Sequence, residues 1–435
     1  MKLPIYTGSL LAAAAILLQY HPAAAANKYQ PTLPLSTDSA FNFQFLIALS
    51  DAATGGSDTA PILGVAQSIK PGDMESYSEN FYELANYTKS QAEDPENSYD
   101  PVNVRDTWFS ASNYFRKVSF YLHRNWSNPL INSSWAEQIA AFDKALAALP
   151  APAHRVQIPA PEGNFTVEAI WYSAAASEDR KLPTLVIGNG FDAAQEDSYH
   201  YFVPYALARG WNCITYEGPG QPTVRINQNK GYINEWEQVV TPVVDYVLSE
   251  KSHIVDQNKL VLIGNSWGGY LAARAAAFEP RLSAAVLIDG VWDTYSAYSS
   301  ELPPELAAIY EAGNYTEFDN LTLSMRDAGK FPTNAAWGLD QGLWSFNTHS
   351  PSEFFTRTKQ FQLQDVADRI KLPVFVGEAE YDDYFPAVQP QNVKNALGDY
   401  ATLHRFNGTA GLHCQSGATQ EMSRTIFAWL KKTLG

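Results

Sequence analysis

The spacing of apolar and polar residues divides the chain into three parts, and the first is residues 1–26. These residues contain one charge, Lys2, and an apolar run at residues 10–18. Four alanines follow at residues 23–26, which form the kind of small-residue site at which a secretory signal peptide is cleaved. Because the run is short for a bilayer span, we expect a cleaved signal peptide and a secreted or secretory-pathway protein. A retained signal anchor is the alternative.

Residues 27–150 are predicted to form a helical N-terminal domain. Between residues 106 and 122, apolar residues recur at three- and four-residue spacing, as on one face of a helix. They are Trp108, Ala111, Phe115, Val118 and Leu122. Ser134 and Glu137 have the spacing of a capping box and predict the start of a second helix. Pro150 would end that helix.

From about residue 151 the pattern changes to short β-rich runs that alternate with helical segments. The clearest runs are residues 184–188, 213–216, 260–264, 285–289, 373–377 and 402–406. Runs that are apolar throughout, such as Leu185-Val186-Ile187, suit a parallel sheet that is covered on both faces. Their alternation with helices predicts an α/β domain over residues 151–435.

Residues 293–365 interrupt this alternation and are predicted to form a cap insertion. They contain several aromatic residues, among them Trp337, Trp344 and Phe346. Ser350-Pro351-Ser352-Glu353 predicts a helix start with proline in the first turn. An insertion at this place in the chain can cover a site at the ends of the strands, and its aromatic residues suit a bulky, apolar ligand. A plain surface excursion is the alternative.

The segment Gly264-Asn265-Ser266-Trp267-Gly268 lies between an apolar run and an alanine-rich helical segment. A G-x-S-x-G motif in this context predicts a sharp turn that projects the serine above the sheet. The glycines are small because bulk would clash in so tight a turn. The following helix N-terminus favours developing negative charge. Ser266 is therefore our candidate nucleophile, with a plain strand–helix turn as the alternative.

A serine nucleophile needs a base to take its proton and an acid to orient that base. In the expected chain order the acid follows the serine, and the histidine comes last. Residues 373–377 lead to Asp382, our choice for the acid. The alternatives are Asp383, Glu380 and Asp289. Residues 402–406 lead into a glycine-rich loop with His413, our choice for the base.

Two backbone N–H groups are expected to stabilise the oxyanion of the reaction. One is predicted at Trp267, directly after the nucleophile, and the other in the loop at residues 189–192. In that loop Gly190 allows a close approach, and the Phe191 N–H is the preferred donor. We also expect the Trp267 indole to line a pocket for an apolar group. The loop at residues 217–221 is predicted to be either a pocket wall or a structural turn.

Composition narrows the range of partners. The chain has 435 residues, of which 46% are hydrophobic, and its length suggests two or three domains. Its formal net charge of −16 argues against nucleic acid and against an anionic membrane surface. Neither a phosphate-binding loop nor metal-ligand spacing is visible in the sequence. We therefore expect a small apolar substrate and neither a cofactor nor a metal; a homodimer is left open.

Seven N-x-S/T sequons agree with passage through the secretory pathway. Their asparagines are Asn86, Asn125, Asn132, Asn164, Asn314, Asn320 and Asn407. The two cysteines, Cys213 and Cys414, could form one bridge in an oxidising compartment. We instead expect two buried free thiols, because Cys213 lies within a predicted strand and Cys414 follows the candidate base.

Together these motifs resemble one branch of the α/β-hydrolases. The branch comprises fungal hydrolases of polyketide and polyketide–peptide clusters, such as the fusarin and cytochalasan types, with the bacterial dihydroxypseudooxynicotine hydrolase more distant. The resemblance covers about residues 105–435. It rests on residues 108–125, 189–192, 217–221, 264–269, 380–382 and 413–415. The sequence departs from the usual pattern of the branch at Glu217 and Pro222, where Asp and Gly are usual.

The resemblance implies an α/β-hydrolase fold with a mostly parallel central sheet, and Ser266, Asp382 and His413 as the catalytic triad. We therefore expect a serine hydrolase that acts on a bulky, apolar carbonyl substrate in fungal secondary metabolism. Hydrolysis of an ester, lactone or amide, cleavage of a C–C bond next to a carbonyl, and acyl transfer with ring closure all remain open. The alternatives are a secreted general esterase or peptidase, and a non-catalytic binding protein on the same fold.

Overall fold

A computed structural model describes residues 32–151, 153–174, 180–300 and 302–435. Residues from Leu35 to Gly435 form one compact unit. The predicted signal peptide at residues 1–26 lies outside the described residues. No helix within the described part is long and apolar enough to cross a membrane.

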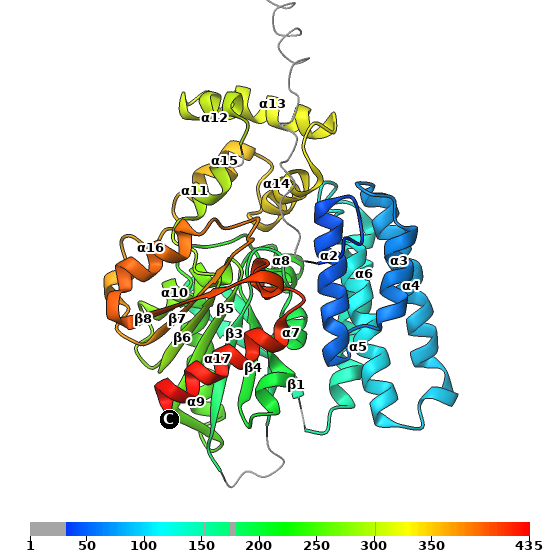
Figure 1. Ribbon diagram of the computed structural model, residues 1–435, viewed down its shortest axis with the longest axis vertical. Coiled ribbons are helices and arrows are strands. Elements are labelled where there is room, and N and C mark those ends of the chain that lie inside the picture. The colour runs from blue at the N-terminus through cyan, green and yellow to red at the C-terminus, as the bar shows by residue number, and fades with distance from the viewer. Residues whose placement is uncertain (1–31, 152, 175–179, 301) are drawn as a thin grey trace, which may run out of the picture. The chain divides into compact units, whose positions relative to one another are not determined.

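A sheet with eight strands in the described residues forms the centre of this unit (Figure 1). The strands are β1 Ala153–Ala160, β2 Phe165–Tyr172, β3 Leu182–Gly188, β4 Asn212–Glu217, β5 Val255–Asn265, β6 Ala284–Ile288, β7 Val374–Ala379 and β8 Ala401–Phe406. Their order is β1-β2-β4-β3-β5-β6-β7-β8. Strands β3 to β8 are parallel, while β2 is antiparallel to both of its neighbours. All six predicted runs are strands, and the β1–β2 hairpin was not predicted.

Different helices bury the two faces of the sheet. The helices next to it are α7 Gln195–Leu207, α8 Pro222–Gln228, α9 Glu237–Glu250, α10 Gly268–Ala276, α16 Val388–Leu397 and α17 Thr419–Leu434. Successive strand residues point to opposite faces. Val186 and Leu262 accordingly pack with α9 and α10, while Leu185 and Val261 pack with α7 and α17. The strands are apolar throughout because both faces are covered.

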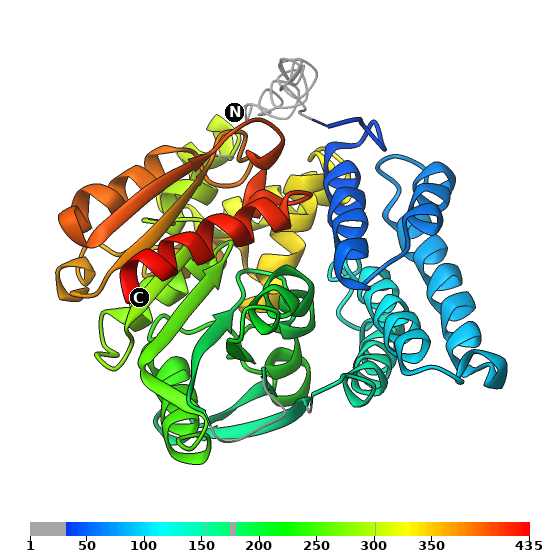
Figure 2. The ribbon, with the colours of Figure 1, turned by 60° about the horizontal axis from the view of Figure 1, so that its bottom comes forward.

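The N-terminal part of the chain is helical, and its helices lie side by side in both ribbon views (Figure 1, Figure 2). They are α2 Ser39–Asp51, α3 Thr59–Ser68, α4 Met74–Glu93, α5 Pro101–Val118 and α6 Pro129–Ala147. Phe109 of α5 shares a core cluster with the strand residues Leu185 and Ile187. The helical part and the sheet therefore share a hydrophobic core within one compact unit.

The predicted capping box at Ser134 is wrong. Helix α6 begins earlier, where the Asn128 side chain accepts a hydrogen bond from Leu130 N and Pro129 occupies the first turn. An asparagine cap followed by proline is a strong helix start. Ser134 lies inside the helix, and its hydroxyl donates to the Leu130 carbonyl oxygen.

The predicted cap insertion is a run of helices, α11 Thr294–Ser299, α12 Pro304–Glu311, α13 Tyr315–Asp327, α14 Thr333–Ser345 and α15 Pro351–Thr358. The predicted start of α15 is confirmed, because Ser350 Oγ accepts from Glu353 N at 3.1 Å and Pro351 stands in the first turn. Residues of α11, α13, α14 and α15 line the same cavity as Ser266. The cap therefore lies over the carboxyl ends of the parallel strands.

The asparagines of the sequons and the two cysteines differ in their exposure to solvent. The asparagines of all seven sequons are described, and each is exposed, Asn407 included. Cys213 and Cys414 are both buried free thiols, as expected. Burial raises the pKa of the Cys414 thiol to about 12, so this thiol is neutral at physiological pH.

Candidate active site

The turn between β5 and α10 holds Ser266 in a conformation that few side chains adopt. Its φ is +58°, in the left-handed region. The flanking glycines leave no room for a side chain, since a Cβ on Gly264 would lie 1.9 Å from the Gly268 carbonyl oxygen. A Cβ on Gly268 would lie 2.8 Å from the Asn189 carbonyl oxygen. Ser266 thus stands on a tight turn at the carboxyl end of β5.

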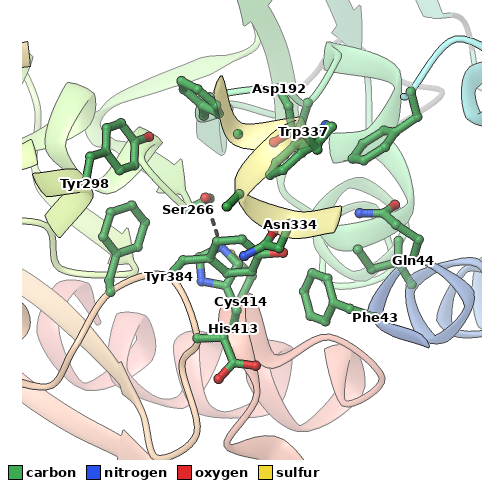
Figure 3. Close-up of a pocket in the computed structure, with 18 of the residues that line it drawn as sticks. Phe43, Gln44, Asp192, Ser266, Tyr298, Asn334, Trp337, Tyr384, His413 and Cys414 are labelled. Carbon is green, nitrogen blue, oxygen red and sulfur yellow. Dashed lines mark hydrogen bonds between the residues drawn. The ribbon is translucent and has the colours of Figure 1, made fainter. Parts of the chain in front are cut away.

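His413 reaches Ser266 from the loop after β8. Its Nε2 lies 2.9 Å from Ser266 Oγ (Figure 3). On the other side of the ring, His413 Nδ1 lies 2.9 Å from Asp382 Oδ2. Asp382 comes from the loop after β7, and its Oδ1 accepts from Tyr384 N and Phe385 N at 2.8 and 2.9 Å. The three residues selected from the sequence therefore form a continuous hydrogen-bonded chain.

A second carboxyl group reaches the same imidazole nitrogen. Asp289, directly after β6, places its Oδ2 2.8 Å from His413 Nδ1. From the sequence, Asp289 was an alternative to Asp382 as the acid, whereas the structure brings both to one ring. Glu380 is not at this position; its carboxylate accepts from Gly408 N at 2.9 Å. Asp383 is among the residues that line the cavity.

The two carboxyl groups differ in the hydrogen bonds that stabilise their charge. Burial and the neighbouring charge of Asp382 raise the pKa of Asp289 to about 7. Its Oδ1 is buried without a hydrogen-bond partner among the described residues. Burial also acts against the Asp382 carboxylate, but His413 and the backbone N–H of Phe385 outweigh it, so the pKa of Asp382 is lowered. Asp382 is therefore ionised at physiological pH, whereas Asp289 takes up a proton as the pH falls below about 7.

The His413 ring is buried, and this burial works against its charged form. The carboxylates of Asp382 and Asp289 outweigh it and hold the pKa of His413 well above the ordinary imidazole value. Cys414 Sγ lies 3.3 Å from Nε2, on the side that faces Ser266. Both ring nitrogens thus have polar neighbours, which fixes the orientation of the ring.

Asp289, His413 and Cys414 also offer three potential metal-ligand atoms within 4.8 Å of one another. Two of these atoms are already in contact with other groups: His413 Nε2 lies within hydrogen-bond distance of Ser266 Oγ, and Asp289 Oδ2 lies 2.8 Å from His413 Nδ1. The third, the Cys414 sulfur, belongs to a protonated thiol. A metal site requires a deprotonated thiol and a free imidazole nitrogen. The group therefore fits proton transfer better than metal binding.

The loop after β3 lies against the serine turn. A Cβ on Gly190 would lie 2.8 Å from Trp267 N, so only glycine permits this approach. The Gly190 carbonyl oxygen accepts from Tyr232 Oη at 2.6 Å. Because a trans peptide directs its N–H opposite to its carbonyl, the Phe191 N–H points away from Tyr232. Among the described residues, neither this N–H nor that of Trp267 has an acceptor.

The Trp267 indole does not line a pocket, contrary to our expectation. The ring is fully buried below the turn, and its Nε1 donates to Thr294 Oγ1 at 2.7 Å. Tyr232 and Phe361 pack against it, with ring centroids 4.6 and 5.0 Å away. The indole is therefore part of the core that supports the turn.

The loop at residues 217–221 is buried and structural rather than a cavity wall. Its Gln221 side chain donates to the Asn189 carbonyl oxygen at 2.8 Å and accepts from Gly218 N at 2.8 Å. The Glu217 carboxylate accepts from Gln195 N at 2.7 Å. This loop holds the backbone of the loop after β3, where the candidate oxyanion donors lie.

A cavity of about 240 Å³ opens above Ser266, between the cap, the sheet and helices α2 and α5. One part of the cavity is aromatic, and its lining residues include Tyr298, Trp337 and Tyr384. In Figure 3, Tyr298 of this aromatic part and Gln44 of a second part lie on opposite sides of Ser266. The other part is polar. Its lining includes Gln44, Asp51, Arg116, Lys117, Asp192 and Asp197.

Sequence reasoning missed this polar part. The adjacent charges of Arg116 and Lys117 lie in the last turn of α5, a helix whose apolar face was recognised. Both charged side chains are about 95% buried. The sign of this polar part in the sequence was the pair of adjacent cationic residues next to the apolar positions of the predicted helix.

Comparison with known proteins places the chain in a family. The model of the alpha/beta hydrolase family matches residues 185–410. Hydrolase LUC6 of Fusarium sp. is 32% identical over 409 residues, covering 91% of this chain and 96% of that protein. The chain belongs to the alpha/beta hydrolase family. It is a hydrolase, and the fold inferred from its motifs is confirmed.

Other fungal hydrolases match along most of the chain. Hydrolase acrC of Aspergillus aculeatus is 29% identical, covering 90% of this chain and 95% of that protein. The 20-hydroxy-prefusarin hydrolase FUS2 of Gibberella moniliformis is 28% identical, covering 90% and 96%. The crystal structure of 2,6-dihydroxy-pseudo-oxynicotine hydrolase shares the fold, with a TM-score of 0.68 at 17% identity over 88% of this chain and 95% of that chain. The resemblance inferred from the sequence is thereby confirmed.

Proposed function

We propose that the protein is a serine hydrolase in which Ser266 is the nucleophile, His413 the general base and Asp382 the acid that orients it. The observation that carries this proposal is the pair of contacts made by the His413 ring. Its Nε2 lies 2.9 Å from Ser266 Oγ and its Nδ1 lies 2.9 Å from Asp382 Oδ2. This is the geometry that lets an imidazole take the serine proton while a carboxylate stabilises the resulting charge.

The reaction begins when Ser266 Oγ attacks a carbonyl carbon and its proton passes to His413 Nε2. The carbonyl oxygen becomes an oxyanion, which the N–H groups of Trp267 and Phe191 stabilise. The tetrahedral intermediate collapses to an acyl-enzyme, and His413 returns the proton to the leaving group. An incoming hydroxyl, from water or from the substrate itself, then gives its proton to His413 and attacks the acyl carbon. Ser266 leaves with that proton, which restores the resting enzyme.

Asp382 is the orienting acid in this proposal, and Asp289 is a second group on the same nitrogen. Two observations favour this division. Asp382 accepts two backbone N–H bonds, which stabilise a carboxylate, whereas Asp289 has a buried oxygen without a partner in the described chain. The pKa of Asp289 is raised by burial to about 7, so this side chain is largely neutral under mildly acidic conditions.

The aromatic cavity and the relatives support a substrate class. A cavity lined by Tyr298, Trp337 and Tyr384 suits a bulky, apolar molecule with a reactive carbonyl. One relative carries the name of a hydrolase of 20-hydroxy-prefusarin, and others are fungal hydrolases of similar length. We propose that this chain acts in fungal secondary metabolism on a polyketide-derived substrate. The exposed sequon asparagines support passage through the secretory pathway.

Labelling with a fluorophosphonate probe tests the catalytic assignment. We expect the probe to label the wild type and not Ser266→Ala, while Ser324→Ala, an exposed serine on α13, is labelled like the wild type. Competition with apolar esters should slow the labelling. A Ser266→Ala protein that is still labelled, or that turns over a polyketide ester at the wild-type rate, would refute the assignment. Equal hydrolysis of small peptide esters and bulky esters would favour a general esterase.

A further inference from the structure

The polar part of the cavity contains two buried cations that the catalytic proposal does not use. Arg116 and Lys117 are consecutive residues of α5, and each side chain is about 95% buried. Burial of a charge is costly unless it has a partner. The partners of the two cations therefore show which one is free to bind a ligand.

The Arg116 guanidinium is paired with groups of the protein itself. Its Nε lies 3.2 Å from Asp197 Oδ2, and one of its terminal nitrogens donates to the Asp192 carbonyl oxygen at 2.7 Å. Asp192 directly follows Phe191 in the loop after β3, and Asp197 lies in the first turn of α7. Arg116 thus fixes the loop beside the candidate oxyanion donors.

The Lys117 ammonium has fewer protein partners than Arg116. Its Nζ donates to Gln44 Oε1 at 3.2 Å, and no carboxylate of the described residues lies within ion-pair distance. An ammonium group has three donors, so two remain available where Lys117 lines the cavity. Among the acids around Lys117, the charge of Asp51 of α2 acts on it most strongly, and Asp51 Oδ2 accepts from Asn113 Nδ2 at 2.8 Å.

We propose that the Lys117 ammonium binds an acidic oxygen of the substrate, a carboxylate or an enolate, while the apolar remainder of that substrate occupies the aromatic part of the cavity. This inference rests on the proposed function, because it assumes that the cavity above Ser266 receives the substrate. It identifies the substrate as an amphipathic acid with its reactive carbonyl between an apolar body and an anionic end. An acidic end at Lys117 also determines which carbonyl meets Ser266.

The charges around Lys117 predict how such binding depends on pH. On α5 and the β3–α7 segment, Arg116 faces Asp197 and Asp192, and the pKa of Asp192 is raised by burial. On α2, burial raises the pKa of Asp51 to about 7. Below that pH the Asp51 carboxyl is neutral and does not oppose an incoming anion. Above it the Asp51 carboxylate competes for the Lys117 charge. Burial also lowers the pKa of the Lys117 ammonium, so anion binding should weaken as the pH rises for both reasons.

The test uses octanoate and octanamide, which share an apolar chain and differ in the charge of the end group. Their dissociation constants for the full chain are measured by calorimetry at pH 6 and pH 8. We expect octanoate to bind about ten-fold more tightly than octanamide at the lower pH, as a charge-assisted hydrogen bond implies. Lys117→Met should abolish this preference, and Lys117→Arg should keep part of it. Lys70→Met, an exposed lysine of the helical part, serves as the control.

Asp51→Asn is a second test variant, and its expected effect on octanoate binding is opposite to that of Lys117→Met. It removes the competing carboxylate, so at pH 8 this variant should keep more of the preference for octanoate than the wild type does. The proposal is overturned if Lys117→Met keeps the wild-type ratio of the two constants, or if the wild type binds octanoate no better than octanamide. It is also overturned if Asp51→Asn and the wild type respond equally to pH. Because binding needs no turnover, an unreactive Ser266 would refute the catalytic proposal while leaving this result interpretable.

Discussion

Replacing Asp289 with asparagine tests whether two carboxyl groups act on one imidazole. Asp289 Oδ2 lies 2.8 Å from His413 Nδ1, and the side chain is 99% buried. Above a pH of about 7, where Asp289 is ionised, its charge helps to hold the pKa of His413 above the ordinary imidazole value. An opposite charge this close shifts a pKa by about 1 to 3 units. Asp289→Asn should therefore lower the pKa of His413, and we expect the pH dependence of activity to shift by about one pH unit.

The sign of the effect follows from the role proposed for His413 as a base. Only the neutral ring can accept the Ser266 proton, so activity rises as the pH passes the pKa of His413. Loss of the Asp289 charge should move this acidic limb of kcat/KM to lower pH. The profile is measured with a p-nitrophenyl ester on the wild type and Asp289→Asn, with thermal denaturation as a control for folding. An unchanged limb, or a shift to higher pH in a folded variant, would refute the reasoning.

Two further predictions concern the same site. Asp382→Asn should lower kcat about 10³-fold or more, because it removes the ionised acid. This loss should be far larger than the loss in Asp289→Asn, and equal losses in the two variants would contradict this ranking. Gly190→Ala should lower kcat about 10²- to 10³-fold with little change in KM, since its Cβ would lie 2.8 Å from Trp267 N. A steady-state comparison with wild type measures both, and a Gly190→Ala enzyme at full activity would disprove the oxyanion assignment.

The sequence predicted the parallel core of the sheet because strands buried on both faces appear as short, uniformly apolar runs. The β1–β2 hairpin was missed for the opposite reason. Strand β1 is an edge strand in which charged and apolar residues mix, and Pro159 lies within it. Its partner β2 contains Glu168, which accepts from Gln157 of β1. Pairing of this kind depends on the neighbouring strand, which periodicity along one segment cannot show.

The part of the site that could be predicted is the part whose positions follow from the order of the strands along the chain. A serine turn, an acid and a histidine, each following a strand, meet at one edge of a parallel sheet. The joint role of Asp289 and Asp382 was not predictable, because two strand ends offered an acid and the sequence does not give their distances to His413. Lys117 was missed because its partner Gln44 is 73 residues away along the chain.

The contacts of the cap explain why the missed residues and the predicted ones form one site. Tyr232 donates to the Gly190 carbonyl oxygen, and its own backbone N–H donates to Ser345 at the end of α14. Gln341 of α14 donates to the Phe191 carbonyl oxygen at 3.4 Å. The base of the cap and the two candidate oxyanion residues therefore belong to one hydrogen-bonded unit. These hydrogen bonds connect α14, which lines the aromatic part of the cavity, to the backbone that carries the candidate oxyanion donors.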